Sequence, residues 1–256
     1  MKRYNKDLVK LRFENSFSTY DEHAVVQREM AEKLADYVFA SCGENYKKVL
    51  EIGCGTGFLT RHIMNDFKIK KLLINDISPG VIDYIEKIAP YCNFLIGDME
   101  NIVFDTKFNI VISNAAFQWA EDLQSMINRF YHVLKPDGVL AFTTFGEHNF
   151  EQITKISNRK LMYKNLDELE PMFPDFEIKI LKEEVINLEF KSPVDVLRHI
   201  KGIGANAMAA EFWTKGVLKD FNKKYRDYFS TEEGVSLTYH PIYVVLKKKD
   251  KELEVI

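Results

Sequence analysis

Hydrophobic and polar positions follow two different periods along the chain, and the first part of the pattern is helical. Thr19 and Glu22 stand three positions apart, the spacing of a capping box that begins a helix. Gly43 then follows as a natural stop. We therefore predict one helix over residues 15–40. Its apolar stripe recurs every four positions, at Val26, Met30, Leu34 and Val38.

From residue 47 onward, short apolar runs alternate with stretches of helical spacing. Ser78 followed by Pro79 indicates a helix start, because serine caps a helix and proline suits its first turn. The Lys-Pro-Asp-Gly sequence at 135–138 predicts a break before the last run. Strands that alternate with helices are typical of a parallel sheet with helices on both faces. The runs predict five strands, at 47–52, 71–76, 93–98, 108–114 and 139–146.

After Gly146 the alternation loosens. About 45 residues separate the last two predicted strands. A segment of this length is too long for a plain connection and is typical of a cap. We therefore expect one domain over residues 1–256, in which a cap or substrate region accompanies the sheet. The patterns predict a long strand at 176–190, helices at 192–208 and 209–230, a strand at 236–248, and a cap formed by 147–175 and 191–235.

Composition narrows the class of protein. The 256 residues are 46% hydrophobic and 13% aromatic, which excludes a disordered chain. The formal charge of −3 lacks the broad basic field that nucleic-acid binding needs. Three scattered cysteines favour neither a disulfide framework nor a four-ligand zinc site. With no apolar stretch of membrane-spanning length, we expect a reduced cytoplasmic protein without a metal, a membrane or a nucleic-acid partner.

The candidate chemistry begins with Glu51 and the glycine-rich turn that follows the first strand, Gly53-Cys54-Gly55-Thr56-Gly57. Glycines let the backbone turn tightly and approach a ligand, and the helix that follows presents free N–H groups. A dinucleotide fingerprint needs its last glycine three residues after the second, where this chain has Phe58. The spacing therefore favours S-adenosylmethionine over a dinucleotide. Cys54 is expected to be structural.

Two aspartates support an adenosine ligand. Asp76 ends the second strand, where its carboxylate can accept both ribose hydroxyls, and Asp98 ends the third strand, where it can accept from the adenine amine. Ligands of open α/β sheets lie beyond the carboxyl ends of the strands. One such aspartate alone would more simply be a helix cap or a solvated turn. Their register behind a glycine turn makes a binding site the better interpretation.

These motifs, together with LKPDG before the fifth strand, resemble those of class I S-adenosylmethionine-dependent methyltransferases over residues 47–146. Further segments along the chain resemble the malonyl-acyl-carrier-protein O-methyltransferase family of biotin synthesis. The resemblance implies a Rossmann-like sheet of seven strands, mostly parallel with an antiparallel last strand, a lid helix at 15–40 and a helical cap before the last strand. The segments are 17–31, 113–123, 141–153, 197–208 (IKGIGA, where the family has LKGIGA) and 236–243 (LTYH).

The resemblance also implies roles for individual residues toward S-adenosylmethionine. Gln27 or Arg28 is suited to its methionine carboxylate, while packing of the lid helix is a serious alternative role for Tyr20 and His23. Trp119 is equally suited to the core. The implied cofactor-binding residues are Tyr20, His23, Gln27, Arg28, Glu51, Gly53, Cys54, Gly55, Gly57, Asp76, Ile77, Asp98, Met99, Asn114 and Ala115. The implied methyl-transfer pocket is formed by Tyr20, Phe117, Gln118 and Trp119.

The reaction that the family implies turns the free carboxylate of a malonyl thioester into a methyl ester. A carboxylic acid has a pKa of about 4, so this nucleophile is ionised at neutral pH and needs no general base. In-line positioning can be worth roughly 7–11 kcal/mol. For the substrate carboxylate the family segments offer Arg198 and Lys201, three apart on one helix face, and Tyr239 and His240. A solvated basic face is an equal alternative for the first pair, and packing is the commoner role of a strand tyrosine.

The implied partner is an acidic acyl carrier protein bearing malonyl, with malonyl-coenzyme A as an alternative donor. A basic docking surface is then expected. Residues 152–166 carry Lys155, Arg159, Lys160 and Lys164 and no acid; between 211 and 228, Lys215, Lys219, Lys223, Lys224 and Arg226 outnumber Glu211, Asp220 and Asp227.

Two other functions remain open at this point. One is a methyltransferase for another small carboxylate or metabolite. The other is a catalytically silent module that senses S-adenosylmethionine or the carrier.

Overall fold

The computed structural model describes residues 5–157, 163–205 and 214–249. The chain forms two compact units, each built from three segments. The sheet unit comprises Gln27–Thr144, Leu166–Lys182 and Ile242–Ile256. The helical unit comprises Met1–Val26, Phe145–Asn165 and Glu183–Pro241.

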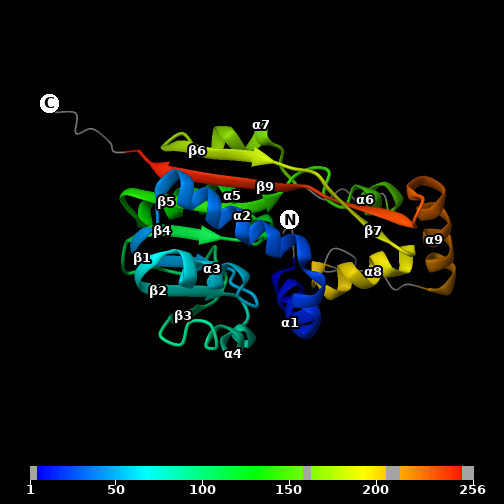
Figure 1. Ribbon diagram of the computed structural model, residues 1–256, viewed down its shortest axis with the longest axis horizontal. Helices are drawn as coiled ribbons and strands as arrows, with labels where there is room; N and C mark the ends of the chain where they lie inside the picture. Colours follow the sequence, from blue (N-terminus) through cyan, green and yellow to red (C-terminus); the bar gives the residue numbers. More distant parts are fainter. Residues whose placement is uncertain (1–4, 158–162, 206–213, 250–256) are drawn as a thin grey trace. The chain divides into compact units, whose positions relative to one another are not determined.

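A seven-stranded sheet forms the centre of the sheet unit, in the order β3-β2-β1-β4-β5-β9-β6 (Figure 1). Strand β1 pairs in parallel with both β2 and β4, which places the polar ends of these strands at one edge of the sheet. The sheet is mostly parallel and its last strand runs antiparallel. The strands are β1 (Asn45–Ile52), β2 (Lys68–Asp76), β3 (Asn93–Ile96), β4 (Phe108–Ser113), β5 (Leu134–Phe145), β6 (Phe176–Glu183) and β9 (Pro241–Lys248).

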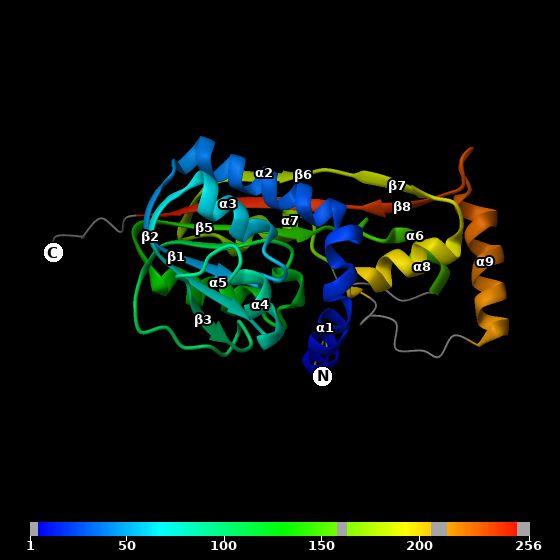
Figure 2. The ribbon, with the colours of Figure 1, turned by 60° about the horizontal axis from the view of Figure 1, so that its bottom comes forward.

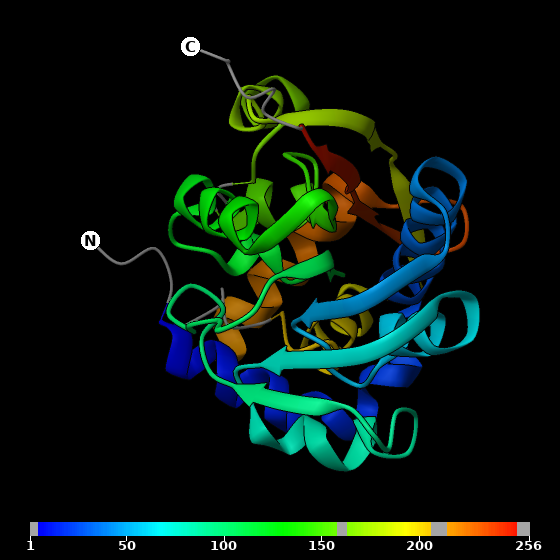
Figure 3. The same ribbon diagram turned by 90° about the vertical axis from the view of Figure 1, so that its left-hand side faces the viewer.

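Helices cover both faces of this sheet. Figure 3 shows α2 (Val25–Cys42) and α3 (Phe58–Asp66) on one face and α5 (Leu123–Val133) on the other. The central strands are buried on both sides, and β4 carries the apolar run Ile110-Val111-Ile112 with none of these side chains exposed. Fully buried parallel strands are expected to be such continuous apolar runs. The short helices α4 (Ile82–Ile85) and α7 (Leu166–Leu169) complete the unit.

The helical unit is built around a two-stranded antiparallel ribbon, β7 (Ile186–Phe190) with β8 (Val235–Tyr239). Helix α8 (Pro193–Gly202) contacts both α1 (Lys6–His23) and α9 (Lys215–Phe229), as Figure 2 shows. Helix α6 (Glu151–Ser157) contacts α9 and β8. Ser192 caps α8 by accepting from the Asp195 backbone N–H, so the start of the helix predicted for 192–208 is confirmed.

The five predicted strands and the parallel sheet are confirmed, but the predicted break at 135–138 lies inside β5. Asp137 has a positive φ of 57° there. The pairing of β5 with β4 also shifts register between Phe108 and Ile110. The turn-forming residues therefore disturb the start of the strand instead of preceding it.

The single helix predicted for 15–40 is wrong. Helix α1 begins earlier, after Asn5, whose side chain accepts from the Leu8 backbone N–H. Thr19 lies inside α1, and its hydroxyl donates to the carbonyls of Ser16 and Gly202. The helix ends at Ala24, where ψ is 47°, and α2 begins at Val25. The apolar stripe therefore belongs to α2, and the capping-box spacing at Thr19 marked no helix start.

The two long strands predicted at 176–190 and 236–248 are each divided between two sheets. The first becomes β6 and β7, and the second becomes β8 and β9. Pro241 begins β9 and has no N–H to donate to a sheet ladder, which explains an interruption at this point. The apolar pattern continues across both interruptions because strands of either sheet need a buried face. Helix α8 likewise ends at Gly202, earlier than the predicted 208, and α9 begins at Lys215.

Candidate functional site

The glycine-rich turn after β1 is fixed by its own backbone. Gly53 has a φ of 67°, and a Cβ on it would lie 2.5 Å from the Cβ of Ala116, so a larger residue is excluded on two grounds. The N–H groups of Gly53 and Cys54 donate to the Asn75 carbonyl at 2.8 and 3.2 Å. Gly57, with a φ of 92°, is the N-cap of α3. The turn thus delivers the chain from β1 into the start of a helix, as the sequence predicted.

Asp76 is tied to this turn. Its Oδ2 accepts from the Gly55 N–H at 3.0 Å and its Oδ1 accepts from the Ser78 N–H at 2.9 Å. Burial raises the pKa of Asp76, while these backbone donors oppose that shift by favouring the carboxylate. A carboxylate oxygen can accept more than one hydrogen bond, so both oxygens of Asp76 remain able to accept from a ligand. Ile77, next to it, is half-buried.

Glu51 lies beneath the same turn and is 1% exposed. Its Oε2 accepts from the Thr60 hydroxyl of α3 at 2.8 Å. Burial, with a smaller contribution from the Asp76 charge, raises the pKa of Glu51 to about 8. Its Oε1 is buried without a hydrogen-bond partner among the described residues. Burial also raises the pKa of the Cys54 thiol, which keeps this cysteine protonated.

Asp98 follows β3 and shapes the loop that carries it. Its Oδ1 accepts from the Glu100 N–H at 3.1 Å and its Oδ2 from the Asn101 side chain at 2.9 Å. Met99 is half-buried and packs against the core. Sequence reasoning missed Arg129 of α5, whose guanidinium donates to the carbonyls of Met99, Glu100 and Ile102. The helical spacing of α5 gave no signal of this contact, because the partners are backbone atoms.

A second hydrogen-bonded group closes the end of β4. The Asn114 amide donates to the Gln27 carbonyl at 2.8 Å, and its Oδ1 accepts from the Thr143 hydroxyl at 2.7 Å. The Ala115 N–H donates to the same hydroxyl at 2.8 Å. Ala115 has a φ of 51°, which is uncommon for a residue with a Cβ. Thr143 was not among the residues that the sequence indicated.

The three predicted pocket residues after β4 have different environments. Phe117 is 1% exposed and stacks on Phe142 with ring centroids 4.5 Å apart, so its contacts are those of a core residue. The Gln118 amide donates to the Ala115 carbonyl at 2.6 Å, and its buried Oε1 has no partner among the described residues. Trp119 is half-buried.

The start of α2 brings Gln27 and Arg28 to the sheet unit. Gln27 is 6% exposed, and its side-chain Oε1 is buried without a partner in the described part of the chain. Arg28 is exposed, and its guanidinium lies 5.0 Å from the centre of the Phe58 ring at the start of α3. This is a cation–π contact between a residue of α2 and the first residue of α3.

The other predicted lid residues, Tyr20 and His23, lie in the helical unit. The Tyr20 ring is 6.3 Å from that of Phe13. The His23 ring meets His199 of α8 edge-on at 6.0 Å, and a Cβ on Gly202 would lie 2.2 Å from His23 Cδ2. At His23, helix α1 therefore packs closely on α8, whereas the Tyr20 ring contacts a residue of its own helix.

Arg198 and Lys201 are both exposed on α8. Arg198 is 72% exposed as a side chain and pairs with Asp195 at 2.7 Å. Between them in sequence, His199 is buried and its Nε2 lies 2.6 Å from the Tyr239 hydroxyl. Burial, assisted by His23, lowers the pKa of His199 to about 4. The sequence did not indicate His199, because the spacing of Arg198 and Lys201 identifies the exposed face of α8 and His199 lies on its buried face.

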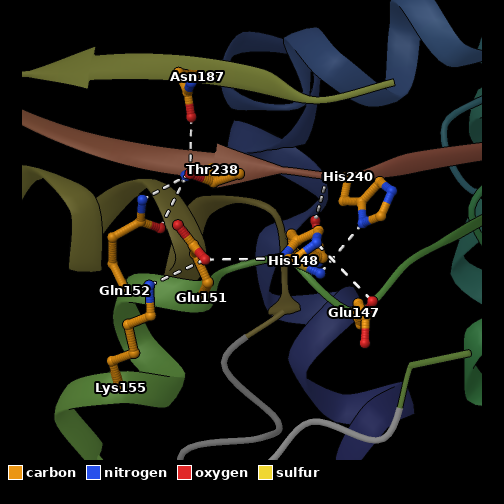
Figure 4. A network of polar contacts seen from close by, with 9 residues as sticks. Glu147, His148, Glu151, Gln152, Lys155, Asn187, Thr238 and His240 are labelled. Carbon is orange, nitrogen blue, oxygen red and sulfur yellow. Dashed lines mark hydrogen bonds and ion pairs between the residues drawn. The ribbon is translucent and has the colours of Figure 1, made fainter. Parts of the chain in front are cut away.

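Tyr239 and His240 are buried, at 0% and 3% exposure. His240 Nδ1 accepts from the His148 N–H at 3.2 Å, which leaves its Nε2 to donate to Glu183 at 3.1 Å. Figure 4 shows this region, with His148 beside His240 and with Thr238 bonded to Gln152 and Asn187. The polar groups of these two predicted substrate residues are thus engaged inside the helical unit.

The structure therefore gathers several predicted cofactor-binding residues at one edge of the sheet but does not gather the predicted substrate-binding residues. Glu51, Gly53, Asp76, Asp98 and Asn114 all stand at the carboxyl ends of the adjacent strands β3, β2, β1 and β4. That edge is where open α/β sheets bind their ligands. The predicted substrate residues form no such group, since Arg198 and Lys201 are exposed whereas Tyr239 and His240 are buried.

No cluster of three or more His, Cys, Asp or Glu side chains suited to a metal occurs within residues 5–157, 163–205 and 214–249. None of the helices in that part of the chain has the length and apolar character needed to cross a membrane.

Comparison with known proteins identifies the fold. A family model described as "Methyltransferase domain" matches residues 49–138. A putative methyltransferase from Bacillus halodurans has a TM-score of 0.59 at 17% identity and covers 85% of this chain and 99% of its own. The N-methyltransferase NodS from Bradyrhizobium japonicum, solved with S-adenosyl-L-homocysteine, has a TM-score of 0.57 at 12% identity, covering 94% and 99%. The fold is that of a class I, Rossmann-like methyltransferase.

Similarity at the sequence level extends along the chain. A malonyl-[acyl-carrier protein] O-methyltransferase from Calditerrivibrio nitroreducens is 40% identical over 230 residues, which is 90% of this chain and 91% of that protein. The protein of the same name from Chlorobium luteolum is 36% identical over 257 residues, covering 96% and 97%. The chain belongs to the malonyl-[acyl-carrier protein] O-methyltransferase family.

Proposed function

We propose that this protein transfers a methyl group from S-adenosylmethionine to the free carboxylate of malonyl carried on an acyl carrier protein. The observation that carries the proposal is similarity over nearly the whole chain to relatives of that name, at up to 40% identity. A methyl ester would make the malonyl unit resemble an apolar primer for fatty-acid elongation, and the family points to biotin synthesis as its destination.

The residues at the carboxyl edge of the sheet suit S-adenosylmethionine. Asp76 has lone pairs left for the ribose hydroxyls, and Asp98 with Met99 is proposed to bind the adenine. Within the described part of the chain, a Cβ on Gly55 would meet no atom within 4 Å, so the turn leaves open space for a ligand. The side-chain Oε1 of Gln27, buried without a partner in the described part of the chain, is an acceptor suited to a ligand ammonium group.

The other cofactor contacts are proposed on the same basis. Arg28 is assigned to the methionine carboxylate, for which a guanidinium is the best match. Gly53, Cys54, Gly57 and the Ala115 backbone would lie against the methionyl part. Tyr20 and His23 are retained as candidates from the family resemblance alone.

The chemistry asks the protein for orientation more than for proton transfer. S-adenosylmethionine supplies a methyl group on a positively charged sulfur. The malonyl carboxylate is ionised at neutral pH, so we assign no general base. Asn114, Ala115 and Gln118 would fix the geometry of transfer, and exclusion of water would favour a step in which opposite charges disappear. Phe117 is proposed to support this end from the core.

For the malonyl carboxylate we propose the exposed pair, Arg198 and Lys201, before the buried pair. Arg198 can exchange its surface ion pair with Asp195 for a ligand carboxylate at small cost, because exposed pairs contribute about 0–1 kcal/mol. Tyr239 and His240 would have to break buried hydrogen bonds to reach a substrate. We therefore propose that these two maintain the helical unit around the substrate residues.

We propose that an acidic carrier protein docks on the basic face of α9. Lys215, Lys219, Lys223 and Arg226 recur every three or four residues, are exposed, and so lie on one face of the helix. Phe221 and Tyr225 form the buried face, while Lys224 pairs with Asp220 away from both. Lys155, from the other predicted basic block, lies on α6 with its Nζ 5.8 Å from the centre of the Phe229 ring at the end of α9. Arg159, Lys160 and Glu211 lie outside the described residues; Lys164 is half-buried.

The direct test is mass spectrometry of malonyl-acyl carrier protein incubated with the protein and S-adenosylmethionine. Malonyl-coenzyme A and free malonate serve as parallel substrates, and calorimetry establishes cofactor binding separately. We expect one added methyl on the carrier-bound malonyl, lost on mild ester hydrolysis. Cofactor binding with no methylation of any of the three would contradict the proposal and favour a sensing module.

A further inference from the structure

We propose that Thr143 of β5 is a positioning residue of the cofactor site, because its single hydroxyl fixes both Asn114 and Ala115. The inference rests on the proposed binding of S-adenosylmethionine at the carboxyl edge of the sheet. Thr143 is fully buried and lies next to the end of β4, where the pairing of Ser113 with Phe142 ends the ladder between the strands.

The hydroxyl acts as acceptor and donor at once. It accepts from the Ala115 N–H at 2.8 Å and donates to Asn114 Oδ1 at 2.7 Å. The donated bond sets the orientation of the Asn114 amide, whose nitrogen must then face the Gln27 carbonyl at 2.8 Å. One threonine therefore determines how β4 is joined to the first turn of α2.

The accepted bond has a second consequence. Ala115 holds a φ of 51°, a left-handed conformation that is unfavourable for a residue with a Cβ. Such a conformation persists where its surroundings enforce it. Thr143 binds the N–H of this residue, and Gln118 donates to its carbonyl at 2.6 Å. The peptide groups at the proposed methyl-transfer end are thus held from both sides, and Thr143 supplies the buried half.

The chain offers matched variants. Thr143→Val keeps the shape but leaves the Ala115 N–H and Asn114 Oδ1 unpaired, while Thr143→Ser restores the hydroxyl. Thr144, next on the same strand, is 5% exposed and takes no part in the hydrogen bonds of Asn114 and Ala115 described above, so Thr144→Val is the control. Calorimetry with S-adenosylmethionine and S-adenosylhomocysteine gives the Kd of each variant, and thermal unfolding gives its Tm.

We expect Thr143→Val to raise both Kd values roughly tenfold or more, because each unsatisfied buried group disturbs the edge it belongs to. Both Kd values of Thr143→Ser should stay within about threefold of those of the wild type. Those of Thr144→Val should equal the wild-type values. Since both valine variants alter a buried position, this control separates loss of the Thr143 hydroxyl from a general disturbance of β5. In turnover, the KM for S-adenosylmethionine should rise without a change in the KM for the malonyl substrate.

A Thr143→Val protein that binds both ligands as the wild type does would overturn the inference, whatever its Tm. If that variant does not fold, Thr143→Ala replaces it, because alanine also lacks the hydroxyl. Wild-type Kd values in the folded alanine variant would overturn the inference equally. A wild-type protein that binds neither ligand would instead contradict the proposed function.

Discussion

The carboxyl edge of the sheet unit and the exposed face of α8 carry functional predictions of the same kind but have very different environments. At the sheet edge, Asp76 is anchored by two backbone N–H groups and stands beside the start of α3. On α8, Arg198 is 72% exposed as a side chain and has one surface ion pair. A pre-positioned group loses little freedom on binding, whereas an exposed side chain must be ordered by its ligand. Substitutions at the two places should therefore differ greatly in effect.

The largest effect is expected for Asp76→Ala. Loss of the two hydrogen bonds that the ribose hydroxyls would donate to this carboxylate costs roughly 3 kcal/mol, or about 100-fold in Kd. Calorimetric titration with S-adenosylmethionine measures it. Asp83→Ala, at an exposed aspartate of α4, is the control and should bind normally. A Kd within threefold of the wild type in Asp76→Ala would remove this residue from the site.

A smaller effect is expected from reversing charge on the basic face of α9. Lys219→Glu with Lys223→Glu should raise the KM for malonyl-acyl carrier protein about tenfold at low salt, and the difference should shrink as salt is added. Steady-state kinetics with malonyl-coenzyme A as second substrate separates docking from chemistry. Lys224→Glu is the matched control, because Lys224 pairs with Asp220 on another face. Equal effects of the control and the double variant would contradict a defined docking face.

The two units should respond to pH in opposite directions. Glu51 has its pKa raised to about 8 from an ordinary 4.5, so the folded protein binds the extra proton. Its contribution to the free energy of unfolding is present below pH 4.5 and is lost as pH rises toward 8, by roughly 1.4 kcal/mol per unit. Glu51→Gln should therefore gain Tm relative to the wild type at pH 8 and not at pH 5. Thermal scans at both values measure this, and a constant difference would contradict the raised pKa.

His199 has the opposite sign. Its pKa is lowered to about 4 from an ordinary 6.5, so the unfolded chain binds the proton more readily. The contribution of His199 to the free energy of unfolding is fully present above pH 6.5 and is lost as pH falls toward 4. Relative to the wild type, His199→Gln should lose less Tm between pH 7 and pH 5, and scans of the two proteins side by side test this. A steeper loss in the variant would show that the histidine is not buried in its neutral form.

The smallest effect is expected on α8. Arg198→Ala and Lys201→Ala should each raise the KM for the malonyl substrate by about threefold, the size of an exposed ion-pair interaction, and leave cofactor binding unchanged. Kinetics at saturating S-adenosylmethionine tests both. An unaltered KM in both variants would exclude the pair from the substrate site.

Much of the sheet unit could be predicted because its signals are local. A buried strand, a glycine turn and an aspartate at the next strand end each depend on a few neighbouring residues, so the pattern around Gly53 and Asp76 identified this edge. The paths of the chain near Ala24 and Pro241 could not be predicted in the same way. Apolar periodicity is the same whether a strand stays in one sheet or joins another, and the break at Ala24 interrupts no apolar stripe.

The site residues that were missed share one physical reason. Thr143 and Arg129 bind backbone groups or side chains far away in sequence, and His199 is buried through contacts with α1 and β8. Contacts of this kind join residues that stand at no fixed spacing in the sequence, so no sequence pattern predicts them. Arg198 and Lys201, by contrast, show a clear spacing and yet lie in solvent, which shows that spacing identifies a helix face but not its use.

The most direct test of the proposed division of tasks is one set of steady-state measurements on Asp76→Ala and the Lys219→Glu, Lys223→Glu double variant. Each is assayed for methyl transfer from S-adenosylmethionine to malonyl-acyl carrier protein. The account predicts that Asp76→Ala raises only the KM for S-adenosylmethionine and that the double variant raises only the KM for the carrier substrate. If both variants raised both KM values to the same extent, cofactor and carrier recognition would not be separate, and the account would be contradicted.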